Sequence, residues 1–282
     1  MMFNKIGVMQ GRLLPKFEGR YQAHPLGYWK DEFFTAKKIG LKYIEFILDY
    51  NDFQKNPLMS EDGIFKILDV IQQTGVKVSS ICADFFMEAP LHSKSRKISE
   101  NSVIVLNKLI FNASKIGVKD IVIPCVDQSS LLNENDKETL IKNLKVPVDL
   151  ASKYGINLAL ETDLPPKDFA NLLNKFDSNH VTVNYDTGNS ASLGYNIDEE
   201  FDYYGERISD IHIKDREFKG GSVFLGKGSV NFPLFYKNLS KIDFNGPIIM
   251  QAYRDYEGLE IFKKQLDWLK TSYNKYDSTY SS

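Results

Sequence analysis

One pattern recurs along the chain and limits its fold more than any other feature. A segment that can form a helix ends at a glycine, and a short apolar run follows that glycine. The glycines are Gly40, Gly75, Gly117 and Gly155, spaced by 35, 42 and 38 residues. A glycine just past a helix adopts the left-handed conformation that ends the helix, and this spacing suits one strand–helix unit. The pattern therefore predicts a fold built from repeated strand–helix units.

Eight short apolar runs are the candidates for the strands of these units. They are nearly continuous in Val, Ile and Leu, as expected for parallel strands covered on both faces. The runs cover residues 5–9, 41–46, 76–81, 118–123, 156–161, 181–185, 208–213 and 247–251. Eight units in 282 residues have the scale of a (β/α)8 TIM barrel. A doubly wound open sheet is the alternative, but no Gly-x-Gly-x-x-Gly motif follows the first run.

The domain organisation follows from the lack of any linker-like segment inside the chain. We expect one barrel domain over residues 1–271 and a polar, frayed C-terminal tail over residues 272–282. The chain has two cysteines, Cys82 and Cys125, and both lie in apolar runs. The sequence therefore predicts two buried, reduced thiols in place of a disulfide framework.

Charge and hydropathy narrow the range of partners. The chain has 35 basic and 37 acidic residues, a net charge of -2, which argues against a general nucleic-acid binder. No run of about 18 apolar residues is present, and the N-terminal residues lack the apolar core of a signal peptide. The sequence predicts a cytoplasmic protein that binds neither nucleic acid nor membranes.

Polar residues stand at the C-terminal ends of the predicted strands, where the reactive groups of a barrel lie. Glu161, Asp186 and His212 end three successive strands, and carboxylates brought together there are costly without a cation. Taken singly, each is also compatible with a helix cap or a loop hydrogen bond. Together they offer two oxygens and one nitrogen, a set that suits Mn²⁺, Mg²⁺, Co²⁺ or Zn²⁺. Gln251 could add an amide oxygen to this predicted site for one divalent ion.

Further polar residues near the same strand ends are candidates to contact a substrate. For the acidic ones the alternative role is a structural hydrogen bond. The basic ones suit a substrate phosphate or carboxylate, or else they neutralise the neighbouring acids. The candidates are Arg12, Glu45, Asp84, Lys214, Asp215, Arg216 and Arg254.

Six segments, taken in their order along the chain, carry a resemblance to a known family. They are residues 7–13 (GVMQGRL), 81–87 (ICADFFM), 160–163 (LETD), 185–189 (YDTGN), 212–215 (HIKD) and 225–232 (LGKGSVNF). With these segments the chain resembles the xylose-isomerase-like barrel superfamily, in particular its sugar and sugar-phosphate isomerase and epimerase branch. The resemblance extends over nearly the whole chain.

The resemblance implies a set of metal ligands and a reaction. The ligands would be Glu161, Asp186, His212 and the residue at 251, and the reaction would remove a proton next to a carbonyl to give an enediolate. The family usually has Glu at the last position, where this chain has Gln251. An amide oxygen can bind a metal, but it is neutral and takes no proton, so we expect the metal to bind more weakly.

The same substitution bears on the type of reaction. Epimerisation in the family resembles a two-base process, with Glu161 and the residue at 251 as the pair. Because Gln251 is no base, the sequence favours isomerisation with Glu161 as the single base. A base from another strand end, such as Glu45 or Asp84, would restore epimerisation.

Other functions fit parts of the sequence. A sugar dehydratase or other lyase would use the same barrel, and a catalytically impaired sugar-binding relative would explain Gln251. The superfamily's DNA-repair endonucleases need several histidines at strand ends, and of four histidines only His212 is so placed. The main prediction is therefore a divalent-metal-dependent sugar or sugar-phosphate isomerase or epimerase. Since family members are often dimers or tetramers, the resemblance also implies a homo-oligomer.

Overall fold

The computed structural model describes residues 5–242 and 244–280 of the chain. Eight parallel strands form a closed barrel in the order β1, β2, β3, β4, β5, β6, β7, β10, and β10 pairs with β1 to complete the ring. The strands are β1 (Ile6–Met9), β2 (Tyr43–Ile47), β3 (Lys77–Cys82), β4 (Asp120–Cys125), β5 (Asn157–Thr162), β6 (Val181–Asp186), β7 (Ile208–Ile213) and β10 (Ile248–Met250). Each predicted run forms one of these strands, with ends that differ by no more than two residues. The predicted (β/α)8 barrel is confirmed.

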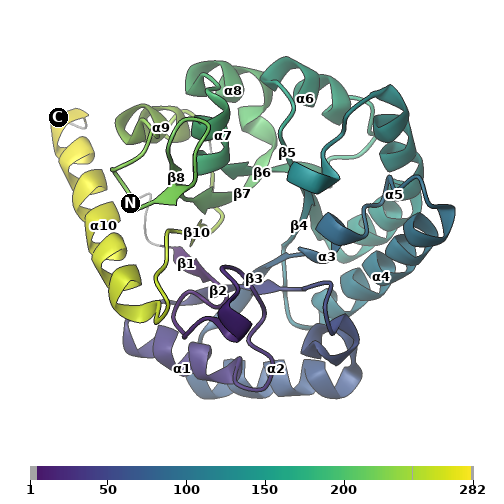
Figure 1. Ribbon diagram of the computed structural model, residues 1–282, viewed down its shortest axis with the longest axis horizontal. Coiled ribbons are helices and arrows are strands. Elements are labelled where there is room, and N and C mark those ends of the chain that lie inside the picture. Colours follow the sequence, from purple (N-terminus) through teal and green to yellow (C-terminus); the bar gives the residue numbers. More distant parts are fainter. Residues whose placement is uncertain (1–4, 243, 281–282) are drawn as a thin grey trace.

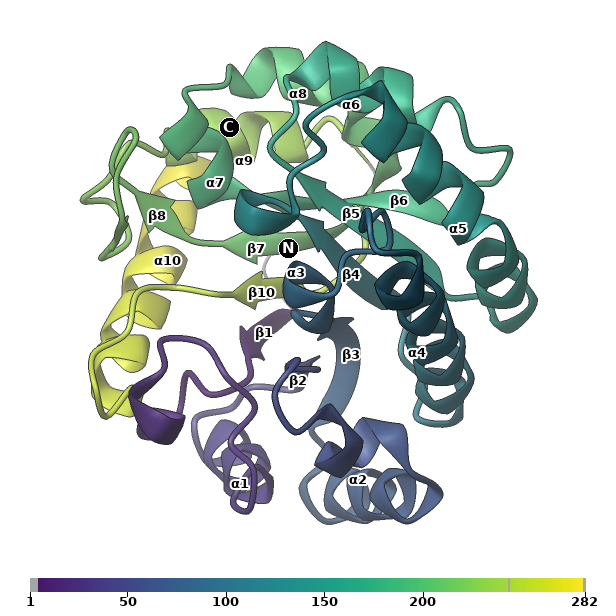
Figure 2. The same cartoon turned by 45° about the vertical axis from the view of Figure 1, so that its right-hand side comes forward.

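The helices surround this barrel, as Figure 1 and Figure 2 show. They are α1 (Lys30–Lys38), α2 (Glu61–Thr74), α3 (Phe85–Glu88), α4 (Arg96–Lys115), α5 (Glu134–Tyr154), α6 (Pro166–Leu173), α7 (Thr187–Leu193), α8 (Ile197–Tyr204), α9 (Phe232–Leu239) and α10 (Leu259–Tyr280). Gly75 and Gly155 end α2 and α5 with φ angles of 75° and 64°, the left-handed conformation that the glycine pattern predicts. Within the described residues, none of these helices is both long and apolar enough to cross a membrane.

The apolar core has two parts because side chains alternate across each strand. On β1, Val8 belongs to a large cluster between strands and helices, while the next residue, Met9, belongs to a small separate cluster. The small cluster takes one residue from each of six barrel strands and fills part of the interior: Met9, Ile47, Cys82, Val122, Ala159 and Ile249. Cys82 and Cys125 are both free and buried, as predicted.

The C-terminal segment differs from its prediction. We expected a frayed tail from Ser272, but α10 continues as a helix to Tyr280. One face of this helix packs on α9: the rings of Tyr273 and Tyr276 each lie 5.5 Å from the ring of Tyr236. The hydroxyl of Tyr236 also donates to Ser272 Oγ at 3.2 Å. These aromatic contacts stabilise the helix, although the segment is polar in composition. Residues 281–282 lie outside the described part.

The loop that follows β1 contains a histidine whose burial makes stability depend on pH. The ring of His24 lies 5.2 Å from that of Phe46, and its Nδ1 is 2.9 Å from Gln10 Oε1. Burial, with a smaller effect of the Arg20 cation, lowers the pKa of His24 to about 3. Below pH 6.5 the histidine of the unfolded chain binds a proton, but His24 in the folded state stays neutral. The free energy of unfolding therefore decreases as the pH falls from 6.5 towards 3.

We expect the free energy of unfolding to fall by about 3 kcal/mol between pH 7 and pH 4.5 because of this histidine alone. His24→Phe should remove that part of the pH dependence, as measured by urea denaturation across this range. His180→Phe, at the half-buried residue before β6, is the control for losing a histidine. An unchanged pH dependence in His24→Phe would contradict this assignment.

Candidate functional site

Three of the predicted ligands come together at the C-terminal end of the barrel. Glu161, Asp186 and His212 stand on β5, β6 and β7, and one side-chain atom of each lies within 4.8 Å of the other two. Strand pairing brings two of them together, because Asp186 and His212 are direct partners in the β6–β7 register. All three side chains are buried.

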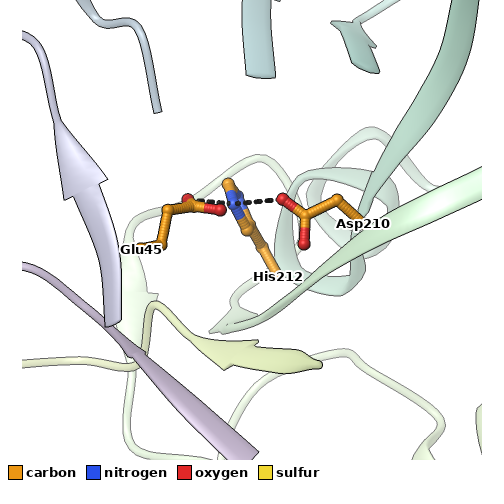
Figure 3. Close-up of side chains that lie close together, drawn as sticks. All are labelled: Glu45, Asp210 and His212. Atoms are coloured by element: carbon orange, nitrogen blue, oxygen red, sulfur yellow. Dashed lines mark hydrogen bonds and ion pairs between the residues drawn. The ribbon is translucent and has the colours of Figure 1, made fainter. Parts of the chain in front are cut away.

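His212 is held so that one ring nitrogen faces the other two residues. Its Nε2 lies 2.7 Å from Glu45 Oε1, as Figure 3 shows. Its Nδ1 lies 3.9 Å from Asp186 Oδ2 and has no hydrogen-bond partner among the residues that the structure describes. A carboxylate on one nitrogen fixes the proton there and leaves the lone pair of the other for a cation. Glu161, Asp186 and His212 thus fit a divalent ion in donor type and orientation.

The partner of His212 belongs to a buried pair of carboxyl groups. Glu45 also accepts a hydrogen bond from Ser80 Oγ at 2.5 Å. Asp210 Oδ2 lies 3.9 Å from the same Nε2 atom of His212, and Figure 3 draws both contacts as dashed lines. Burial raises the pKa of Glu45 to about 7 and that of Asp210 well above its usual range. Two carboxyl groups this close together and this deeply buried do not both ionise near neutral pH. Glu45, predicted to contact substrate, lies behind His212 and orients it.

Glu161 is the site's candidate base. Burial raises its pKa, and the neighbouring carboxylate of Asp186 raises it further. Its Oε1 accepts a hydrogen bond from Asn189 Nδ2 at 2.5 Å, and Asn189 Oδ1 accepts one from Arg216 Nη1 at 2.8 Å. The raised pKa improves Glu161 as a proton acceptor near neutral pH. Arg216, predicted to contact substrate, orients Asn189 in this arrangement.

The fourth predicted ligand, Gln251, has a different contact. Its Oε1 accepts a hydrogen bond from Lys214 Nζ at 2.8 Å, and the same ammonium lies 2.7 Å from Asp186 Oδ2. Its Nε2 donates to Gln22 Oε1 at 3.0 Å. Gln251 therefore lies beside Asp186, and its oxygen faces an ammonium group.

Three of the residues predicted to contact substrate make hydrogen bonds to the protein's own backbone. Arg254 donates to the carbonyl oxygens of Gly11 and Leu14, and Arg12 donates to that of Ala252. Asp215 accepts the amide N–H groups of Gly226, Gly228 and Val230. All three side chains are buried, and their hydrogen bonds hold the loops around the barrel mouth. The sequence could not distinguish this role from substrate binding.

A polar cavity of about 590 Å³ adjoins the site. Gln22 connects the two, since its Nε2 donates to Asp84 Oδ2 at 2.8 Å and its Oε1 accepts from Gln251. Asp84, which we predicted to contact substrate, lines this cavity. The cavity is lined by Arg20, Gln22, Asp49, Tyr50, Asn51, Asp84, Met87 and Glu88. The lining contains three carboxyl groups and one guanidinium, that of Arg20, which pairs with Asp49 at 3.3 Å.

Sequence reasoning missed two residues of this region. Asp210 stands two positions before His212 on β7, and side chains two apart on a strand share a face, so this spacing was a usable signal. Gln22 lies in the loop between β1 and α1, where no periodicity applies. Its contacts with residues 84 and 251 depend on the fold alone.

Comparison with known proteins agrees with this architecture. The sequence profile of the xylose isomerase-like TIM barrel family matches residues 33–272. The L-ribulose-5-phosphate 3-epimerase UlaE of Escherichia coli (strain SMS-3-5 / SECEC) is 25% identical over 263 residues, which cover 86% of this chain and 89% of that protein.

Two solved structures share the fold. The IolI protein with a bound zinc atom superposes with a TM-score of 0.75 at 17% identity, covering 99% of this chain and 100% of the other. The D-allulose 3-epimerase from Methylomonas sp. in complex with D-allulose gives a TM-score of 0.75 at 17% identity, covering 95% and 96%. With the family profile matching most of its length, the chain belongs to the xylose isomerase-like TIM barrel family.

Proposed function

We propose that this protein is an enzyme that removes the proton next to the carbonyl of a ketose or ketose phosphate, as a sugar isomerase or epimerase. The observation that carries the proposal is the convergence of Glu161, Asp186 and His212, with the pKa of Glu161 raised by burial. The epimerase name of the Escherichia coli relative supports the same class of substrate and reaction.

A divalent cation belongs to this proposal. Glu161, Asp186 and the Nδ1 atom of His212 would hold it, with Gln251 as the neutral fourth ligand. The zinc atom in the IolI structure, which shares the fold, supports a divalent metal in this protein. Mn²⁺, Mg²⁺, Co²⁺ and Zn²⁺ all suit this set of ligands. When bound, the cation would stabilise the negative charge that develops on the substrate's oxygens.

The chain's own residues would perform the other tasks. Glu161 takes the substrate proton, and the hydrogen bond from Asn189 keeps its carboxylate oriented. The cavity beside the site binds the remaining part of the sugar, whose hydroxyl groups suit the side chains of Asp84 and Asn51. Because carboxyl groups outnumber the single guanidinium there, this cavity suits hydroxyl groups better than a phosphate.

Whether the product is an isomer or an epimer depends on whether a group on the opposite face of the substrate can return a proton to the same carbon. Gln251 cannot return a proton there, which favours a single-base isomerase. Epimerisation, the reaction in the name of the Escherichia coli relative, needs another proton donor on that face. Both outcomes share the first step, proton removal by Glu161, so one assay tests both.

The experiment is a ¹H NMR screen of ketoses and ketose phosphates in D₂O, with protein that has been stripped by EDTA and with protein reloaded with Mn²⁺. We expect deuterium to enter the position next to the carbonyl for at least one sugar, faster with Mn²⁺ than after EDTA treatment. Analysis of the product then distinguishes isomer from epimer. Loss of water from the sugar would instead identify a lyase, and binding without any exchange would identify a non-catalytic sugar-binding protein.

A further inference from the structure

Lys214 contacts two of the four residues that would bind the cation. Its Nζ lies 2.7 Å from Asp186 Oδ2 and 2.8 Å from Gln251 Oε1. The side chain of Lys214 is 12% exposed and that of Asp186 is 1% exposed, so water screens this contact little. An ammonium group and a metal ion need the same lone pairs, and they cannot use the same ones at once.

The position of Lys214 is determined by its surroundings. Thr187 Oγ1 donates to its carbonyl oxygen at 2.6 Å and accepts from its amide at 3.0 Å. Its side chain runs over Gly188, where an added Cβ would lie 2.8 Å from Lys214 Cγ. The φ angle of Gly188 is not positive, so its backbone conformation does not require a glycine. The lack of a side chain instead leaves space for Lys214. Thr187 and Gly188 thus position Lys214 so that its ammonium group reaches the site.

The amide of Gln251 matches this arrangement on both of its ends. Its oxygen accepts from Lys214, and its nitrogen donates to Gln22 Oε1, which also accepts from Arg12 Nη2 at 2.8 Å. A carboxylate at position 251 would place an oxygen against Gln22 Oε1, and two acceptors cannot form a hydrogen bond. The nitrogen of Gln22 is not available as a donor, because it already donates to Asp84. The surroundings therefore select an amide here, and Gln251 is part of a continuous hydrogen-bonded chain.

We propose that Lys214 competes with the divalent cation for Asp186 and Gln251 and thereby sets the affinity of the site for metal. This inference rests on the metal site of the proposed function. Compared with a glutamate at position 251, the neutral amide of Gln251 gives the ligand set one negative charge fewer. The ammonium of Lys214 then pairs with the carboxylate of Asp186. A cation binds only when Lys214 leaves Asp186, which releases a positive charge at the barrel mouth.

The test is calorimetric titration of the purified, EDTA-stripped protein with MnCl₂, with free Mn²⁺ also measured by electron paramagnetic resonance. Lys214→Met removes the charge at similar length and is expected to bind Mn²⁺ about tenfold to hundredfold more tightly than the wild type. Lys214→Arg keeps a cation and is expected to stay close to the wild type. Lys227→Met, at an exposed lysine on the loop held by Asp215, is the matched control and should bind as the wild type does.

Further variants keep the result interpretable. Gln251→Glu is expected to tighten Mn²⁺ binding less than Lys214→Met does, because the new carboxylate faces Gln22 and pairs with Lys214. Lys214→Gln repeats the charge removal if Lys214→Met folds poorly, as judged by its thermal unfolding. In Lys214→Met, the second change His212→Asn should abolish the gain, which places the ion at the proposed ligands.

Equal or weaker Mn²⁺ binding in both Lys214→Met and Lys214→Gln would overturn the competition while leaving the proposed function intact. If the wild type and every Lys214 variant fail to bind Mn²⁺, the competition is overturned together with the metal site. Proton exchange measured in EDTA would then decide separately whether the proposed reaction takes place.

Discussion

Replacing Glu161 by glutamine is expected to remove nearly all exchange of the substrate proton, with a loss of about 10²–10⁴-fold from the missing base alone. Glutamine keeps the size of the side chain and can still contact Asn189, but it accepts no proton. It also removes one charged ligand, so the loss of metal adds to the loss of the base. The measurement is deuterium incorporation from D₂O into the best substrate of the screen, at saturating Mn²⁺.

Two comparisons separate the lost base from other effects. Glu138→Gln makes the same change at an exposed position of α5 and should leave exchange unchanged. Thermal unfolding of Glu161→Gln should show that the barrel is intact. Exchange at the wild-type rate in Glu161→Gln would overturn the mechanism, because the proposal gives no other residue the role of the base.

The second large effect concerns stability, at Glu32 on α1. This fully buried carboxyl group accepts the amide N–H of Gly11 at 2.6 Å and that of Leu13 at 2.9 Å, in the loop after β1. Glu32→Ala leaves both amides buried without an acceptor, and each such loss costs about 1–3 kcal/mol. We expect the free energy of unfolding to fall by about 2–6 kcal/mol at pH 5.5, as measured by urea denaturation.

The same residue carries a pH dependence whose sign can be worked out. Burial raises the pKa of Glu32 to about 7, although its two backbone hydrogen bonds and the Arg12 cation lower it. The folded state thus holds a proton that the unfolded chain loses above pH 4.5, and stability falls as the pH rises from 4.5 to 7. The cost of Glu32→Ala should therefore be about 2 kcal/mol smaller at pH 8 than at pH 5.5.

Glu32→Gln is the control for this prediction. It retains one carbonyl oxygen as an acceptor and does not titrate, so its cost at pH 5.5 should be smaller than that of Glu32→Ala. A cost of Glu32→Ala below about 1 kcal/mol at pH 5.5 would mean that water replaces the carboxylate at Gly11 and Leu13.

Much of the architecture could be predicted from the sequence because it depends on local patterns. The glycines that end α2 and α5 and the apolar run that becomes β7 are each visible within one segment. Placing Glu161, Asp186 and His212 together needed one more rule, that parallel strands present their C-terminal ends at the same edge of a barrel. That rule applies to residues on strands and needs no knowledge of their side-chain contacts.

The roles of the charged residues could not be predicted in this way. Arg12, Asp215 and Arg254 have the same residue types and strand-end positions as the other candidates, yet their hydrogen bonds go to backbone groups of the loops. The helical end of α10 was missed for a related reason. Its stabilising contacts are rings on α9, which the polar composition of residues 272–280 does not reveal.

The sequence by itself determined the barrel, the convergence of Glu161, Asp186 and His212, and the amide at position 251, because each follows from strand order or residue identity. Only the tertiary structure decided what surrounds them. It placed the ammonium of Lys214 between Asp186 and Gln251, and it placed the Glu45 carboxylate on Nε2 of His212. Glu45 and His212 are 167 residues apart along the chain. Contacts over such separations depend on the closure of the whole barrel, and no local pattern of residues encodes them.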